Sequence, residues 1–231
     1  MDSSDLAHLQ NTAATFDEIS SCGKPSIPLD FPDPVFSSVT RVNASVLNPT
    51  TNEESVVPNV FYAIRPDGMP PPRAYWIGRK LKKAIYGCVR SCTVLKVREG
   101  GWAGSHGNSQ WEITSEMAAV KIIDLEAVQE LRGSHIEDPI KEVAAMQFLS
   151  SQNNVIQNVM PCWDLFKDEK YIYLVMPFCS SGELFTQVER NGRFQESIAR
   201  FWFKQLLNVS IVELVCIDIL LYHMICYHFL V

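Results

Sequence analysis

The pattern of apolar and polar positions changes near residue 73. Residues 1–72 are rich in Ser, Thr, Asn and Pro, and they show no sustained hydrophobic period. This composition is typical of a disordered arm, and the Pro-rich run at 69–73 predicts a hinge at its end. An aromatic cluster at 31–36 would suit a docking peptide, although a cluster of this kind in a linker usually has no partner.

Beyond residue 73 the pattern predicts an α+β fold. Runs of β-branched and apolar residues predict strands at 75–81, 87–97, 111–124, 160–166 and 171–176. A polar, Gly- and Ser-rich stretch at 100–110 predicts a long surface loop. The resulting sheet has five antiparallel strands.

Two helices are predicted around these strands. Asp138 and Pro139 are typical of a helix start, and the apolar spacing that follows predicts a helix over 138–150 with one buried face. After the last strand, a second amphipathic helix carries Ile198, Phe201, Trp202 and Leu206 on one face. The order of three strands, a helix, two strands and a helical remainder is shared by many α+β proteins.

Composition and charge narrow the functional classes. The 231 residues hold 20 Lys and Arg against 26 Asp and Glu, a net charge of −6 that argues against nucleic acid as a partner. The seven cysteines include no C-x-x-C pair, which disfavours a zinc ribbon or a redox motif. The N-terminus lacks the basic and apolar regions of a secretory signal. We therefore expect free thiols and a cytoplasmic protein.

Two motifs contain a lysine and a glutamate that could act together. The segment Ala118-Ala119-Val120-Lys121 resembles the Val-Ala-Ile-Lys strand of protein kinases, in which the Lys ammonium holds the α- and β-phosphates of ATP. Glu142 lies 21 residues later in the predicted helix, at the position of the family's glutamate that pairs with this lysine. The resemblance therefore implies an ion pair that orients Lys121.

The segment from Tyr171 to Phe185 is similar to the last small-lobe strand, hinge and first large-lobe helix of Ser/Thr kinases. The resemblance implies that Met176 is the gatekeeper at the back of the adenine pocket. It further implies that the backbone from Pro177 to Cys179 bonds the adenine edge, with the Pro177 carbonyl as acceptor and the Cys179 amide as donor. Glu183 would contact the ribose or a basic substrate residue.

The glycine-rich loop departs from the family pattern. Residues 81–89 align with Leu-Gly-x-Gly-x-Phe-Gly-x-Val: Leu81, Gly87 and Val89 match, whereas Lys82 and Ala84 replace the first two glycines. Those glycines allow backbone amides to approach phosphate closely, so the replacements should crowd and stiffen the turn. By resemblance, Val89 lies above the adenine and Ala119 beside it.

The resemblance covers roughly 75–207 and implies a protein Ser/Thr kinase that uses ATP and Mg²⁺ and binds protein substrates. No catalytic loop and no Asp-Phe-Gly follow, so the catalytic residues and the Mg²⁺ ligands are missing. We predict three parts: a disordered arm at 1–72, a partial kinase domain at 73–207 and an apolar tail at 208–231. The predicted function is the ATP-binding lobe of a kinase, truncated and inactive as this chain, with weak or lost ATP binding. The alternative is a non-catalytic protein-interaction module.

The C-terminal residues 209–231 contain 18 apolar residues and no Lys or Arg. Three interpretations are open: a translated intron or alternative exon, which the sudden break in resemblance favours, a buried helix that continues, or a transmembrane helix that would associate the chain with a membrane. Glu213, Asp218, His223 and His228 interrupt the apolar run and oppose membrane insertion. We expect this tail to lower solubility rather than to span a membrane.

Overall fold

The computed structural model describes residues 32–104, 107–131, 138–151, 159–182 and 184–213. The chain divides into residues 1–30 and residues 31–231, and all described residues lie in the second unit. The predictions made for residues 1–31 and for residues 214–231 therefore lie outside the described residues.

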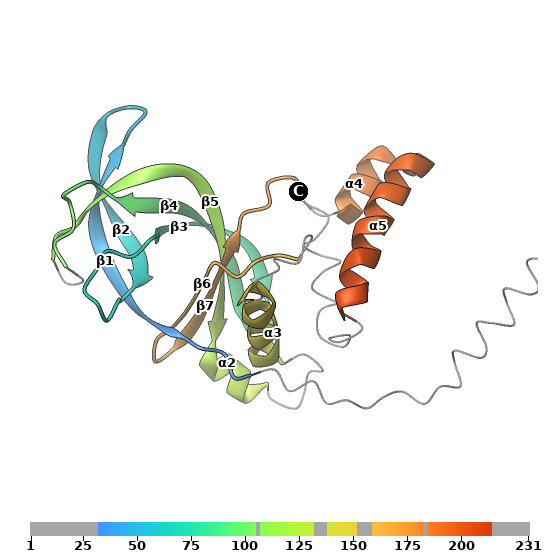
Figure 1. The fold of residues 1–231 in the computed structure, drawn as a ribbon, viewed down its shortest axis with the longest axis horizontal. Coiled ribbons are helices and arrows are strands. Elements are labelled where there is room, and N and C mark those ends of the chain that lie inside the picture. Colours follow the sequence, from blue (N-terminus) through green and yellow to red (C-terminus); the bar gives the residue numbers. More distant parts are fainter. Residues whose placement is uncertain (1–31, 105–106, 132–137, 152–158, 183, 214–231) are drawn as a thin grey trace, which may run out of the picture. The chain divides into compact units, whose positions relative to one another are not determined.

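Seven strands close into a barrel in the order β1-β2-β3-β4-β5-β7-β6 (Figure 1). The neighbouring strands in this order are antiparallel, and β1 closes the barrel through short parallel pairings with β6 at its start and with β5 near its end. The strands are β1 (Ser37–Asn48), β2 (Glu53–Ala63), β3 (Ala74–Ala84), β4 (Gly87–Val97), β5 (Gln110–Asp124), β6 (Asp164–Lys167) and β7 (Tyr171–Pro177).

In the part of the chain that the structure describes, the helices are α2 (Leu125–Glu130), α3 (Pro139–Ser151), α4 (Leu184–Asn191) and α5 (Glu196–Glu213). The predicted start of α3 is confirmed, because the Asp138 carboxylate accepts hydrogen bonds from the Ile140 and Lys141 amides at 3.0 and 3.4 Å. The α+β class and the kinase-like arrangement of β3 to β7 around α3 are likewise confirmed.

The prediction of a disordered arm is wrong for residues 37–63, which form β1 and β2. The Asn- and Thr-rich stretch between them is a hairpin turn, in which the Asn48 side chain accepts from the Thr50 amide and Asn52 adopts a positive φ of 56°. Many outward-facing positions of these strands are polar, and their buried apolar residues pack against strands far along the chain. The amino-acid composition of this segment therefore does not predict the two strands, which the rest of the barrel stabilises.

The barrel encloses one apolar core, and the outer face of β4, β5 and β7 forms part of another. Inside, Phe61 of β2 is fully buried among Tyr75, Phe166 and Tyr173, with ring centroids 5.4, 5.6 and 5.7 Å away. A third cluster around Trp111 and Tyr62 fills the far end of the barrel.

The other face of the sheet carries α3. Val143 and Met146 of α3 belong to the same cluster as Val89, Ala119 and Met176 of the sheet. Side chains on the two faces of β5 therefore pack into different clusters: Ala118 and Val120 face the barrel interior, while Ala119 lies on the α3 side.

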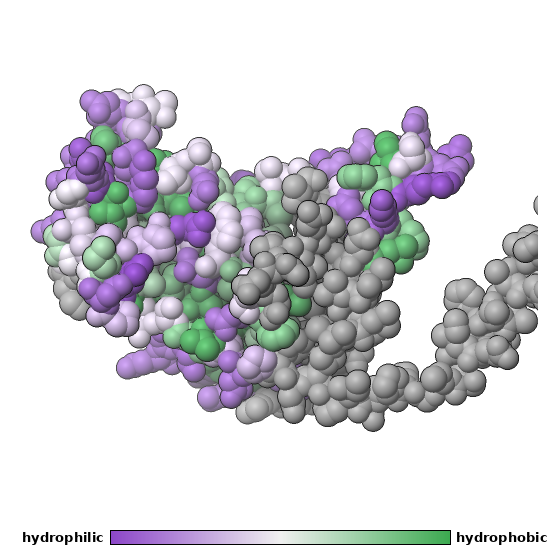
Figure 2. Space-filling model, in the orientation of Figure 1, coloured by the Kyte–Doolittle hydropathy of each residue, from purple (hydrophilic) through white to green (hydrophobic). Residues whose placement is uncertain are grey.

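Helix α5 confirms the predicted amphipathic segment, and several of its apolar side chains are exposed. Phe201 and Phe203 are 60% and 59% exposed, and Figure 2 shows apolar atoms on the surface of this helical part. Among the described residues, no helix is long and apolar enough to cross a membrane. The expected effect of the tail on solubility stays a prediction.

We predict that Phe61→Ala lowers the free energy of unfolding by about 3–5 kcal/mol, because it leaves a cavity among three aromatic rings. Urea denaturation of the two proteins measures this difference. Val56→Ala is the control on the same strand, because Val56 is 74% exposed and its truncation should change stability by less than about 0.5 kcal/mol. Equal small effects of both changes would show that β2 is not part of the folded core.

Candidate nucleotide-binding site

The register of three strands places the predicted nucleotide-facing residues on one face of the sheet. Val89 of β4 is opposite Lys121 of β5, and Ala119 is opposite Met176 of β7. Residues directly opposite in an antiparallel pair, and residues two apart in one strand, point to the same face. Val89, Ala119, Lys121 and Met176 therefore share the face that packs against α3, as the sequence pattern required.

Lys121 and Glu142 form a buried ion pair. The Lys121 ammonium donates to both carboxylate oxygens of Glu142, at 2.7 and 2.8 Å, and the two residues are 8% and 7% exposed. The strand fixes one partner and the capped helix α3 fixes the other. This pairing was implied by the resemblance to protein kinases and is present in the structure.

The segment expected to form a glycine-rich loop is a β-hairpin with a two-residue turn between Ala84 and Gly87. Lys82 is paired with Val89 and Ala84 with Gly87, so the two residues that replace glycines lie in strand β3. Leu81 lies in an irregular stretch of that strand and is 36% exposed.

Gly87 is the position in this hairpin that requires glycine. Its φ is +152°, and a Cβ at this position would lie 2.1 Å from the Ile122 carbonyl oxygen. The neighbouring Tyr86 is buried in the same cluster as Val89 and Ala119. The Tyr86 side chain therefore packs into the cluster that contains Val89 and Ala119, the two residues predicted to contact adenine.

The hinge begins where β7 ends. Pro177 is paired with Ala118, and the Phe178 amide donates to the Met117 carbonyl at 3.2 Å. Cys179 follows, and burial raises the pKa of its thiol. The side chain of Glu183 lies outside the described residues, so its predicted contact with ribose stays a prediction.

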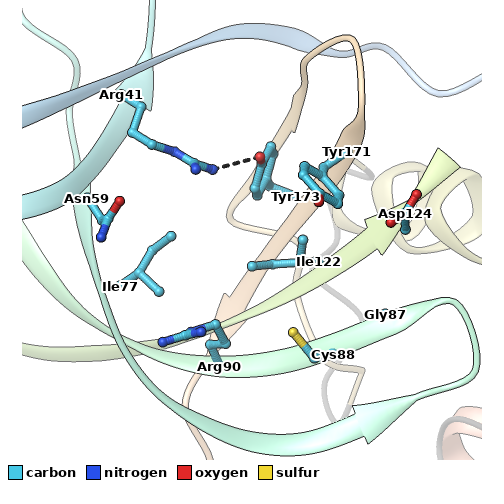
Figure 3. A pocket seen from close by; sticks show the side chains of 10 residues that line it. All are labelled: Arg41, Asn59, Ile77, Gly87, Cys88, Arg90, Ile122, Asp124, Tyr171 and Tyr173. Carbon is cyan, nitrogen blue, oxygen red and sulfur yellow. Dashed lines mark hydrogen bonds between the residues drawn. The ribbon is translucent and has the colours of Figure 1, made fainter. Parts of the chain in front are cut away.

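A separate cavity of about 310 Å³ opens at one end of the barrel (Figure 3). Arg41, Asn59, Ile77, Arg90, Ile122, Tyr171 and Tyr173 line it together with Gly87, Cys88 and Asp124. Gly87 is the one predicted nucleotide-site residue among them, so this cavity and the face that carries Lys121 are different sites. The cavity forms where β2 and β3 diverge, next to their two register pairs at Val60–Trp76 and Phe61–Tyr75.

Polar contacts cross the mouth of this cavity. The Arg41 guanidinium donates to the Tyr173 hydroxyl at 2.7 Å, and that hydroxyl donates to the Asp168 carboxylate at 2.7 Å. Although partial burial opposes the shift, the hydrogen bonds from Tyr173, Lys170 and Tyr171 lower the pKa of Asp168. Sequence reasoning missed this cavity because Arg41 and Asn59 lie in the predicted arm.

A small α+β lobe in which a strand lysine pairs with a helix glutamate beside an apolar sheet face is the arrangement of the nucleotide-binding lobe of protein kinases. Residues 103–210 match the family described as protein kinase domain. This match covers a little under half of the chain, and the chain is similar there to a protein kinase domain.

Several curated plant kinases are similar to part of the chain. CBL-interacting protein kinase 30 of Oryza sativa subsp. japonica is 36% identical over 95 residues, covering 41% of this chain and 18% of that protein. CBL-interacting serine/threonine-protein kinase 9 of Arabidopsis thaliana is 31% identical over 96 residues, covering 42% of this chain and 20% of that protein. The chain thus spans about a fifth of the length of the curated relatives that it matches.

We predict that Lys121→Met lowers the free energy of unfolding by about 3 kcal/mol, because it leaves the buried Glu142 carboxylate without its counter-charge. The double variant Lys121→Met/Glu142→Leu should be more stable than this single variant, since it removes both charges. Lys96→Met is the control: it breaks the exposed pair between Lys96 and Glu112, at 3.3 Å, and should cost at most about 1 kcal/mol. Urea denaturation of the four proteins separates these cases, and a Lys121→Met cost as small as that of Lys96→Met would contradict a buried pair.

Proposed function

We propose that this chain is the ATP-binding lobe of a protein Ser/Thr kinase, and that residues 1–231 bind ATP weakly and do not transfer its phosphate. The observation that carries the proposal is the buried pair of Lys121 and Glu142 beside the face formed by Val89, Ala119 and Met176. The Ser/Thr class rests on the segment from Ser180 to Phe185 and on the names of the similar plant kinases.

The residues of the candidate site suit the adenine and the α- and β-phosphates of ATP, but not its Mg²⁺ ion. ATP would supply the phosphoryl group of the family's reaction, and the fixed Lys121 ammonium would hold its α- and β-phosphates. The apolar face would contact adenine, and the carbonyl of Pro177 and the amide of Cys179 remain the predicted hinge contacts. The fit to Mg²⁺ is poor, because the family's metal ligands are a catalytic-loop Asn and the Asp of Asp-Phe-Gly, and residues 1–231 contain no Asp-Phe-Gly.

Two features support weak binding. Lys82 and Ala84 carry side chains where the family pattern has glycine, and both lie in a paired strand. In addition, Val89, Ala119 and Met176 are only 3–6% exposed, so adenine must displace side chains that are packed against them. Binding energy spent on that displacement is lost from the affinity.

The alternative function, a non-catalytic protein-interaction module, is favoured by apolar side chains at the surface of α4 and α5. Phe185, Phe201 and Phe203 are 68%, 60% and 59% exposed. Both functions use the same fold, and they differ in whether the face around Lys121 holds a nucleotide.

We predict that calorimetry of residues 1–231 with Mg·ATP gives a dissociation constant weaker than about 1 μM, which corresponds to roughly −8.2 kcal/mol. Lys121→Ala should reduce ATP binding to the level of adenosine, whereas Lys96→Ala, which removes an exposed lysine of β4, should leave it unchanged. Identical affinities of the unaltered chain for ATP and adenosine would argue against a phosphate-holding role of Lys121.

The same preparation should incorporate no label from radiolabelled ATP into itself or into a generic protein substrate. Incorporation that Lys121→Ala abolishes, in a preparation free of contaminating kinases, would overturn the inactive part of the proposal. Complete absence of nucleotide binding would favour the interaction module.

A further inference from the structure

The segment that precedes the barrel is attached to α3 by one glutamine. The Oε1 atom of Gln147 accepts a hydrogen bond from the Val35 amide at 2.7 Å, and its Nε2 atom donates to the Val35 carbonyl at 2.7 Å. These two bonds join residues 112 positions apart in the sequence. A side-chain amide that bonds both the backbone N–H and the backbone carbonyl of one residue fixes the direction of that backbone as well as its position.

The same segment is also attached to the sheet. Phe36 packs against the cluster that contains Val143 and Met146 of α3, and the Lys167 ammonium lies 5.3 Å from the centroid of its ring. The next two residues enter the parallel pairing of β1 with β6, at Ser37–Phe166 and Ser38–Lys167. We call residues 35–38 the strap, because they connect α3 to the barrel.

The strap and the ion pair hold different sides of α3. Gln147 lies five positions after Glu142, which places the two side chains about 140° apart around a helix with 3.6 residues per turn. Glu142 points into the lobe and is 7% exposed, whereas Gln147 is partly exposed beside the strap. The helix is therefore fixed from within by Lys121 and from outside by the backbone of Val35.

We propose that Gln147 is a positioning residue that, through the strap, holds α3 where Glu142 meets Lys121. The ordering of residues 35–38 against α3 then becomes a condition for the ion pair. This proposal concerns the geometry of the apo chain and does not depend on whether the site binds ATP.

The reactivity of Lys121 toward a small acylating reagent tests the proposal in the full chain. An ammonium held between both oxygens of Glu142 and 10% exposed in its side chain should react slowly. Sulfo-NHS acetate is added to the folded protein, and mass spectrometry follows acetylation of Lys121 relative to the exposed Lys96. Loss of the strap contact should raise the Lys121 rate, because each local opening of α3 then breaks fewer interactions.

Three variants make the test specific. Gln147→Ala should accelerate acetylation of Lys121 by about tenfold, the factor expected for an opening that no longer breaks two neutral hydrogen bonds. Gln147→Glu should give an intermediate rate, since it keeps the acceptor for the Val35 amide and loses the donor. Val35→Ala should match the unaltered chain, because Val35 uses only its backbone in this contact and its side chain is 76% exposed.

Alkylation of Cys92 reports general unfolding in the same samples. Cys92 is fully buried in the barrel core, away from α3, and its labelling should stay as slow in Gln147→Ala as in the unaltered chain. Faster reaction of Lys121 with unchanged Cys92 supports the proposal. An unchanged Lys121 rate in Gln147→Ala overturns it, as does a parallel rise of Cys92 labelling in both Gln147 variants.

Discussion

Two opposite charges are taken almost completely out of water where Lys121 meets Glu142. Desolvation of each ion costs several kcal/mol, and only close, well-aligned contacts offset that cost. Both oxygens of Glu142 lie within 2.8 Å of the ammonium, so the geometry satisfies this condition. The ion pair keeps this geometry only while α3 stays against the sheet. Many of the other contacts in the lobe hold α3 in that position.

The N-terminal hairpin, formed by β1 and β2, supports the sheet from the face opposite α3. β1 and β2 cover the face of β4, β5 and β7 that points away from α3, and Phe61 fills its centre. The match to the protein kinase family begins at residue 103, so β5, β6, β7 and α3 come from the matched segment while β1 to β4 precede it. The barrel is therefore built from both parts of the chain, and a boundary near residue 73 would cut through its hydrogen-bonded strands.

The sequence predicted the elements whose own residues carry the signal. Strand β4 was predicted with its observed bounds, β5 and β7 were predicted within a residue, and Asp138 with Pro139 located the start of α3. The pairing of Lys121 with Glu142 was implied by the resemblance of two segments to protein kinase motifs. Strands β1 and β2 were missed because many of their outward-facing residues are polar, and their stability comes from partners that no local window contains.

The contacts of Gln147 and Arg41 were unpredictable for a related reason. Each joins residues more than a hundred positions apart, and each uses a partner, the Val35 backbone or the Tyr173 hydroxyl, that has no distinctive sequence pattern. The Gln147 contact ties Val35, two residues before β1, to α3, and the Arg41 contact ties β1 to β7 at the barrel mouth. Neither contact uses the side chain of Lys121 or of Glu142. A defined position of α3 is needed by both proposed functions, because the ATP-binding lobe uses it to place Glu142 beside Lys121 and an interaction module uses it to present a fixed surface.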